Sequence, residues 1–378
     1  MRVRQFKSRV RNYLWNLSGW RTKRKIVVIE SDDWGSIRMP SREVYEKCLK
    51  AGYPVDLIVY ERYDSLASKD DLELLFELLT SFTDKNGNNP VITANCVVAN
   101  PDFRKIKEDD FQKYHYELIS ETFKNYPNHT GNLDLWKEGA KRHIFHPQFH
   151  AREHLNVSKF MKALQQNNSE VHFGFINQMP GCIRKGHLNN GNYYVAATEY
   201  SSEQDKQNKL DIYLEGLDIF EEIFGFKSLS IIPPNYIWSN DFNEPIFNKG
   251  VKYIQGARRM YEPDSGSKPK YSKRFLGMKY PTNQIALVRN VSFEPTIQNN
   301  INIVENCLSE MDIAFRMKKP AIIPSHRINY VGFIDEKNRD NNLLFLKRLF
   351  SICLKKWPDI EFYTSPELGT IISEDIKI

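Results

Sequence analysis

Short apolar runs rich in β-branched residues alternate with longer amphipathic segments along most of the chain. Each short run predicts a buried strand, and apolar residues spaced three and four apart predict a helix that packs on it. Strands are expected at 26–29, 91–98, 144–145, 171–176, 229–232, 251–254, 286–291, 321–323 and 360–363. Helices are expected from Pro40 and Ser41 onward, and at 68–82, 111–123, 157–164, 210–224, 303–317 and 343–357.

This order of elements predicts an α/β protein built from βαβ units around a mainly parallel sheet. Eight or nine such strands fit a closed or nearly closed barrel better than an open sheet. In such barrels the catalytic groups sit where strands end and loops begin. We expect an N-terminal arm over 1–24 and one barrel domain over 25–378. Residues 257–283, rich in Lys, Pro, Gly and Ser, are expected to form a long surface loop.

Composition narrows the class of protein. The 378 residues are 41% hydrophobic and 13% aromatic, which excludes a disordered chain. No run of 18 apolar residues predicts a membrane span. Five cysteines without a Cys-x-x-Cys pair argue against a disulfide framework or a zinc knuckle, and they favour a reducing, cytoplasmic location.

The net charge of +6 comes from one end of the chain. Residues 1–25 hold nine Lys and Arg and no Asp or Glu, so the remainder carries 44 basic against 47 acidic residues. A general nucleic-acid surface is therefore not expected. Apolar residues of the arm follow a helical stripe among these cations, which fits either a helix docked on the barrel or a peripheral contact of residues 1–20 with the inner face of a membrane.

Two neighbouring carboxylates, Asp32 and Asp33, follow directly after the first expected strand. Adjacent side chains there point in different directions, so one carboxylate could hold a cation while the other faces a reacting water. A third group, His326, follows the strand at 321–323. A histidine at such a strand end suits general acid catalysis because its ordinary pKa lies near neutrality.

Three of the nine histidines fall within nine residues, at His146, His150 and His154. Histidines four residues apart can converge on one metal ion if the segment is helical or tightly turned. We therefore expect His146 and His150 to bind a metal. His154 could be a third ligand or could form a local hydrogen bond.

Taken together, these segments resemble the polysaccharide deacetylases of the NodB-homology type, carbohydrate esterase family 4. Residues 30–35 match the family's Thr-Phe-Asp-Asp-Gly-like motif, residues 146–150 match its His-x-x-x-His motif, and residues 324–326 match its Leu-x-His motif. The resemblance covers roughly residues 25–370. It implies an irregular (β/α)7-type barrel.

Carried over by position, the resemblance implies a role for each matched residue. Asp32 would be the catalytic base and His326 the general acid. Asp33, His146 and His150 would hold a divalent metal ion, with zinc favoured and iron, cobalt or nickel also suited.

Two departures from the family pattern concern the groups that orient the catalytic residues. The motif Arg-x-Pro-Tyr corresponds to residues 232–236, where Ile232 replaces the arginine and Asn235 or Tyr236 takes the tyrosine position. The Asp-x-x-Asp-Trp motif has no clear counterpart. Three arginines could take the place of the missing one: Arg152, Arg289 and Arg327.

The resemblance implies a metal-dependent hydrolase that removes N- or O-linked acetyl groups from a sugar or polysaccharide. Trp34, Asn235 and Tyr236 would contact this substrate. The alternatives are a related barrel hydrolase that acts on another C–N bond or on a glycosidic bond, and an inactive carbohydrate-binding relative. Retention of Asp32, Asp33 and the three histidines of the motifs favours an enzyme.

Overall fold

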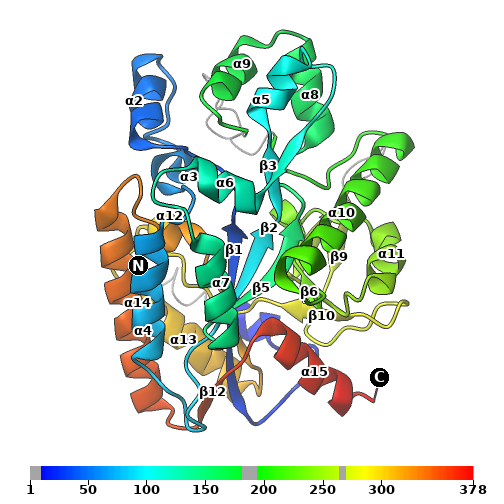
Figure 1. Ribbon diagram of the computed structural model, residues 1–378. Helices are drawn as coiled ribbons and strands as arrows, with labels where there is room; N and C mark the ends of the chain where they lie inside the picture. Colours follow the sequence, from blue (N-terminus) through cyan, green and yellow to red (C-terminus); the bar gives the residue numbers. More distant parts are fainter. Residues whose placement is uncertain (1–9, 181–193, 264–269, 378) are drawn as a thin grey trace.

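The computed structural model describes residues 10–180, 194–263 and 270–377, and Figure 1 shows the arrangement of their elements. Parallel strands form one sheet in the order β10-β7-β6-β5-β2-β1-β11, with β12 paired to β1 beside that path. The strands of the sheet are β1 (Lys25–Trp34), β2 (Ile92–Val97), β5 (Phe145–Ala151), β6 (Ser230–Ile231), β7 (Tyr253–Gly256), β10 (Ile285–Val288), β11 (Ala321–Pro324) and β12 (Ile360–Phe362).

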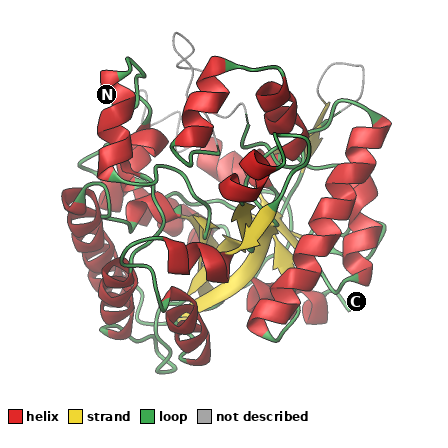
Figure 2. Ribbon diagram, turned by 45° about the horizontal axis from the view of Figure 1, so that its top comes forward, coloured by secondary structure: helices red, strands yellow, loops and turns green. Residues whose placement is uncertain are grey.

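The sheet curls into a nearly closed barrel of mixed α/β type, which confirms the expected fold class (Figure 2). The two edge strands are joined by the chain that follows β10, because the N–H groups of Asn290 and Val291 donate to Ile322 O at 3.2 Å. Since every strand of the sheet runs parallel, all carboxyl ends meet at one rim. Residues that follow different strands therefore come together there.

Helices surround this sheet on the outside (Figure 2). They are α2 (Arg42–Lys50), α3 (Val59–Tyr63), α4 (Lys69–Thr80), α5 (Phe103–Glu108), α6 (Ile119–Asn125), α7 (Asn132–Lys141), α8 (Val157–Gln165), α9 (Ser169–Ile176), α10 (Glu203–Phe224), α11 (Asn243–Asn248), α12 (Pro295–Gln298), α13 (Ile303–Arg316), α14 (Glu336–Lys356) and α15 (Ser365–Asp375). Short 3-10 turns are η2 (Pro234–Tyr236), η3 (Asn240–Phe242) and η4 (Arg327–Asn329). In Figure 1, α2, α3, α5 and α9 gather beyond the carboxyl ends of β1 and β2, and α15 lies at the opposite end.

Helix α4 illustrates how local sequence produces this outer layer. Ser68 accepts from the Asp71 N–H while the Asp71 carboxylate accepts from the Ser68 N–H, a capping box that starts the helix. Leu72, Leu75 and Leu79 are buried against the sheet, as their spacing predicts.

Several expected elements differ in the structure. Residues 171–176 lie in helix α9 rather than in a strand, because a short apolar run has no periodicity that separates the two. The helix expected at 111–123 is replaced by the short strand β4 (Tyr116–Leu118), which pairs with β3 (Ala99–Pro101), and by α6.

Part of the expected loop at 257–283 is an antiparallel hairpin of β8 (Arg259–Glu262) and β9 (Lys270–Lys273). Residues 264–269, between these strands, lie outside the described residues.

The N-terminal arm, as far as the structure describes it, docks on the barrel. Residues 10–15 are helical, and Asn12 Nδ2 donates to Glu310 at 3.1 Å. Lys319 Nζ donates to three backbone carbonyls over residues 18–20. Within the described ranges, no helix is long and apolar enough to cross a membrane.

Candidate active site

The last residues of β1 place two carboxylates at the carboxyl rim of the barrel. Asp33 has a positive φ of 74°, which is uncommon for a residue other than glycine. The pairing of β1 with β2 shifts its register between Ser31 and Trp34, as at a β-bulge. Backbone strain of this kind persists where the surrounding structure holds it and is frequent at functional sites. It turns the carboxylates of Asp32 and Asp33 toward different partners.

Asp33 faces two histidines at the carboxyl end of β5: His150 lies in the strand and His154 follows it. Its Oδ1 lies 3.4 Å from His150 Nε2 and 3.3 Å from His154 Nε2. All three side chains are buried, and their ligand atoms lie within 4.8 Å of one another. Two atoms that each bind a tetrahedral zinc ion at about 2.0–2.1 Å are themselves about 3.3 Å apart. The spacing of Asp33, His150 and His154 therefore fits a metal ion between them.

The hydrogen bonds around these histidines also fit a metal site. His150 Nδ1 contacts Ile232 O at 2.7 Å, which leaves Nε2 facing Asp33. Such a bond to the outer ring nitrogen is the usual orienting contact of a metal-bound histidine. His150 Nε2 and His154 Nδ1 are buried without a hydrogen-bond partner among the described residues. Burial lowers the pKa of His154 to about 3, so the ring is neutral and able to bind a cation.

His146 does not join this group, which corrects the expected ligand set. The segment 145–151 is a strand, not a helix, so residues four apart are separated by about 13 Å. His146 lies near the amino end of β5, where its ring stacks on Phe226. The pair at His150 and His154 has the same four-residue spacing, and it meets Asp33 because β5 ends between its two members.

Asp32 points away from the metal-binding group and toward Arg289. The Nη1 and Nη2 groups of Arg289 donate to its two carboxylate oxygens at 2.8 and 2.7 Å. Asn95 Nδ2 donates to Oδ1 at 2.8 Å. Burial would raise the pKa of Asp32, but the charge of Arg289, followed by that of His326, lowers it to about 2. Asp32 is therefore ionised at neutral pH.

Of the three arginines that could replace the one missing from residues 232–236, Arg289 is the one that contacts Asp32. It follows β10, and its Nε also donates to the buried Glu30 at 2.6 Å. Its Nη1 donates to the Tyr236 hydroxyl at 2.9 Å. The other two candidates serve elsewhere: Arg152 pairs with Glu153 and Arg327 with Asp64.

His326 lies at the same rim, where its Nε2 is 3.5 Å from Asp32 Oδ2. Its Nδ1 contacts Glu294 Oε1 at 2.6 Å. Burial would lower the pKa of His326, but the charge and hydrogen bond of Glu294, with the charges of Asp32 and Asp33, raise it to about 10. The ring is therefore protonated at neutral pH, as a general acid requires.

Glu294 is the partner of the outer ring nitrogen of His326. It also accepts from Asn329 Nδ2 at 2.7 Å, which fixes the carboxylate beside His326. No spacing in the sequence marks Glu294. The sequence offers one signal for these two residues, their charge near the end of an expected strand. Arg289 lies in the second half of the strand expected at 286–291, and Glu294 lies just beyond it.

The three residues expected to contact substrate differ in access. Trp34 is 1% exposed and packs edge-on against Phe145 in the core, so it cannot contact a substrate. Asn235 and Tyr236 are half-buried and both have positive φ, at 57° and 56°. Asn235 Oδ1 is buried without a partner among the described residues.

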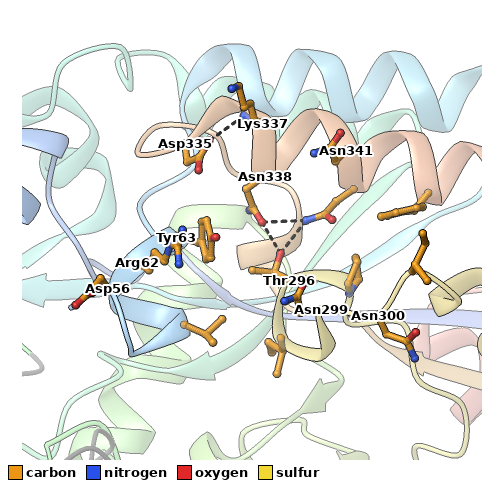
Figure 3. Close-up of a pocket in the computed structure, with 16 residues that line it drawn as sticks. Asp56, Arg62, Tyr63, Thr296, Asn299, Asn300, Asp335, Lys337, Asn338 and Asn341 are labelled. Atoms are coloured by element: carbon orange, nitrogen blue, oxygen red, sulfur yellow. Dashed lines mark hydrogen bonds between the residues drawn. The ribbon is translucent and has the colours of Figure 1, made fainter. Parts of the chain in front are cut away.

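A separate hollow of about 470 Å³ lies on another face of α3 (Figure 3). Asparagines of α14 and residues 295–301 line it, and Asn338 and Asn342 bond to Thr296. None of the catalytic or metal-binding candidates lines this hollow, so it is distinct from the site at the rim.

Similarity to one solved structure, at a TM-score of 0.50, supports the fold. No family model and no curated protein sequence matches the chain. A structure from Parabacteroides distasonis, described as a glycoside hydrolase/deacetylase, is similar with a TM-score of 0.50 and 10% identity, over 93% of this chain and 72% of that one. The Puue allantoinase is similar with a TM-score of 0.48 and 11% identity, over 94% of this chain and 92% of that one. A polysaccharide deacetylase from Pseudomonas aeruginosa PAO1 is similar with a TM-score of 0.46 and 10% identity, over 94% of this chain and 93% of that one.

Proposed function

We propose that this protein is a metal-dependent hydrolase that removes acetyl groups from a sugar or polysaccharide. One observation carries the proposal. A buried Asp-His-His group with unpartnered ring nitrogens lies beside an ionised Asp32 and a protonated His326. Metal-dependent hydrolysis of an amide or ester uses these three functions: a cation site, a proton acceptor and a proton donor.

The residues divide the reaction between them. A divalent cation held by Asp33, His150 and His154 would polarise the acetyl oxygen and activate water. Asp32 accepts the proton of the attacking water, and Arg289 fixes the direction of its carboxylate. His326 donates a proton from Nε2 to the leaving nitrogen or oxygen, because Nδ1 is engaged by Glu294.

Asn235 and Tyr236 are proposed to contact the substrate at the rim. Their strained backbone places the Tyr236 hydroxyl on Arg289 and leaves Asn235 Oδ1 without a partner among the described residues. A sugar hydroxyl or an acetamido N–H can donate to that oxygen.

The test combines metal analysis with acetate release. The purified full-length protein should contain about one divalent metal ion per chain and should release acetate from an acetylated amino-sugar oligomer. A chelator should abolish release, and zinc should restore it. Metal-loaded protein that cleaves the glycosidic bonds of the oligomer without releasing acetate would contradict the deacetylase assignment.

We also propose that the N-terminal arm makes a peripheral contact with an anionic membrane surface. Val10, Leu14, Trp15 and Leu17 are exposed in its described part, and Arg11 lies beside Trp15. Apolar and cationic residues together are typical of interfacial helices. Cosedimentation should occur with phosphatidylserine vesicles, less with phosphatidylcholine, and should be reduced by Leu14→Asp. Equal sedimentation of the variant would reject this contact.

A further inference from the structure

Arg38, in the loop between β1 and α2, is a buried arginine that the proposed reaction does not use. It is 7% exposed, and its Nε is buried without a hydrogen-bond partner among the described residues. A buried charge is costly unless it is paired and hydrogen-bonded. An arginine left in this state next to a candidate active site therefore needs an explanation.

The surrounding structure fixes the position of this arginine. Its neighbours in the loop are tied down, since Ile37 N–H donates to Asn100 at 3.0 Å and Met39 N–H donates to Asp64 O at 3.1 Å. The guanidinium lies over the Tyr60 ring, 5.3 Å from its centroid. Little conformational freedom remains to be lost when a ligand binds.

The nearby carboxylates do not satisfy Arg38. Asp64 Oδ2 lies 3.8 Å from its Nε, beyond hydrogen-bond distance. Asp64 already receives two hydrogen bonds from Arg327, at 3.0 and 2.9 Å. Glu61 is also buried with an unpartnered Oε2, and burial raises the pKa of its carboxyl to about 7. The guanidinium of Arg38 therefore forms a long ion pair with Asp64, but its Nε has no hydrogen bond to a carboxylate within the described part of the chain.

Arg38 is close to the reacting groups. Its positive charge lowers the pKa of Asp33 and the pKa of His154. The Tyr60 ring that it covers meets the His326 ring edge-on, with centroids 6.1 Å apart. A group bound to Arg38 would therefore lie beside the proposed acetyl site, on the side lined by α3.

We propose that Arg38 binds an anionic group of the substrate, a carboxylate or a phosphate, next to the acetyl group that is removed. A guanidinium pairs with both groups in a two-pronged geometry. The inference rests on the proposed function and names its substrate class: an acetylated sugar that carries a negative charge. Arg38 is thus a specificity-determining residue.

The test compares acetylated sugars that differ by one anionic group. N-acetylmuramate carries a lactyl carboxylate that N-acetylglucosamine lacks, and N-acetylglucosamine 6-phosphate carries a phosphate instead. Calorimetry with the zinc-loaded full-length protein should show tighter binding of one anionic sugar by about 10- to 100-fold over the neutral one. Which of the two is preferred identifies the anion.

Variants connect this preference to Arg38. Arg38→Met should abolish the preference, and Arg38→Lys should keep part of it because the charge remains while the two-pronged geometry is lost. Arg62→Met, at an exposed arginine of α3, is the matched control and should keep the full preference. Circular dichroism melting verifies that each variant is folded.

The outcomes separate this inference from the proposed function. Equal binding of all three sugars by the parent protein, or an unchanged preference in folded Arg38→Met, would overturn the role of Arg38 even if acetate is released. An Arg38-dependent preference without acetate release from any sugar would uphold the anion site and contradict the deacetylase.

Discussion

Two buried histidines at opposite ends of the barrel, His326 and His146, are in opposite electrostatic states. At the carboxyl rim, Glu294, Asp32 and Asp33 outweigh burial and raise the pKa of His326 to about 10. At the amino end, burial dominates and lowers the pKa of His146 to about 4. Burial by itself favours the neutral ring, so only close carboxylates keep a buried histidine charged.

The ends also differ in how completely their polar groups are satisfied. The rim holds the strained Asp33 and the unpartnered atoms of His150 and His154. At the amino end, His143 pairs with Glu367 at 2.9 Å, and Glu367 caps α15. Unsatisfied buried groups and strain are costly, and they point to binding and catalysis where they gather. The amino end contributes stability instead.

The largest contrast between the ends is expected for metal binding. Asp33→Ala should lose the metal and reduce acetate release by at least about 10³-fold, since the cation contributes several kcal/mol. His146→Gln should keep both the bound metal and the rate of acetate release. Elemental analysis beside acetate release checks this. Loss of metal in His146→Gln with retention in Asp33→Ala would reverse the assignment of the two ends.

Asp32→Asn should keep the metal but slow the reaction by about 10²–10⁴-fold, because the amide keeps the size of the side chain and cannot accept the water's proton. Metal content and kcat measured on the same preparation separate this effect from that of Asp33→Ala. A metal-free Asp32→Asn protein would show that Asp32 is a ligand rather than the base.

A smaller effect is expected for Glu294→Gln, which removes the main charge that raises the pKa of His326. His326 must be protonated to act as an acid, so activity falls as the pH rises through its pKa. The alkaline limb of kcat/KM should therefore move to lower pH in the variant, with a loss of about 10-fold at pH 9 and less at pH 7. An unmoved limb would rule out the proposed control of His326 by Glu294.

The smallest effect is expected at the amino end. The folded-state pKa of His146, about 4, lies below its ordinary value of 6.5, so its contribution to stability is present above pH 6.5 and is lost as the pH falls through 4. His146→Gln should remove this pH dependence, on the order of 1–2 kcal/mol, from the free energy of unfolding. Urea unfolding at pH 7 and pH 4.5 measures it, and parallel losses in parent and variant would refute it.

The sequence by itself determined the barrel and most of its reactive groups. The alternation of strand and helix patterns fixed a parallel sheet, and parallel strands bring Asp32, Asp33 and His326 to one rim wherever the chain places them. His150 was predicted from its spacing with His146 and from the motif match, and its place near the end of β5 brings it to the same rim. These predictions depend on local periodicity and on the order of elements, which a sequence carries directly.

Only the tertiary structure decided which neighbours complete the site. Whether His146 or His154 joins His150 depends on where β5 ends, and a difference of a few residues in that boundary moves a side chain to the other end of the barrel. Arg289 and Glu294 lie more than 250 residues from Asp32 and have no motif. Their positions follow from packing between distant segments, and no local pattern in the sequence encodes such a contact.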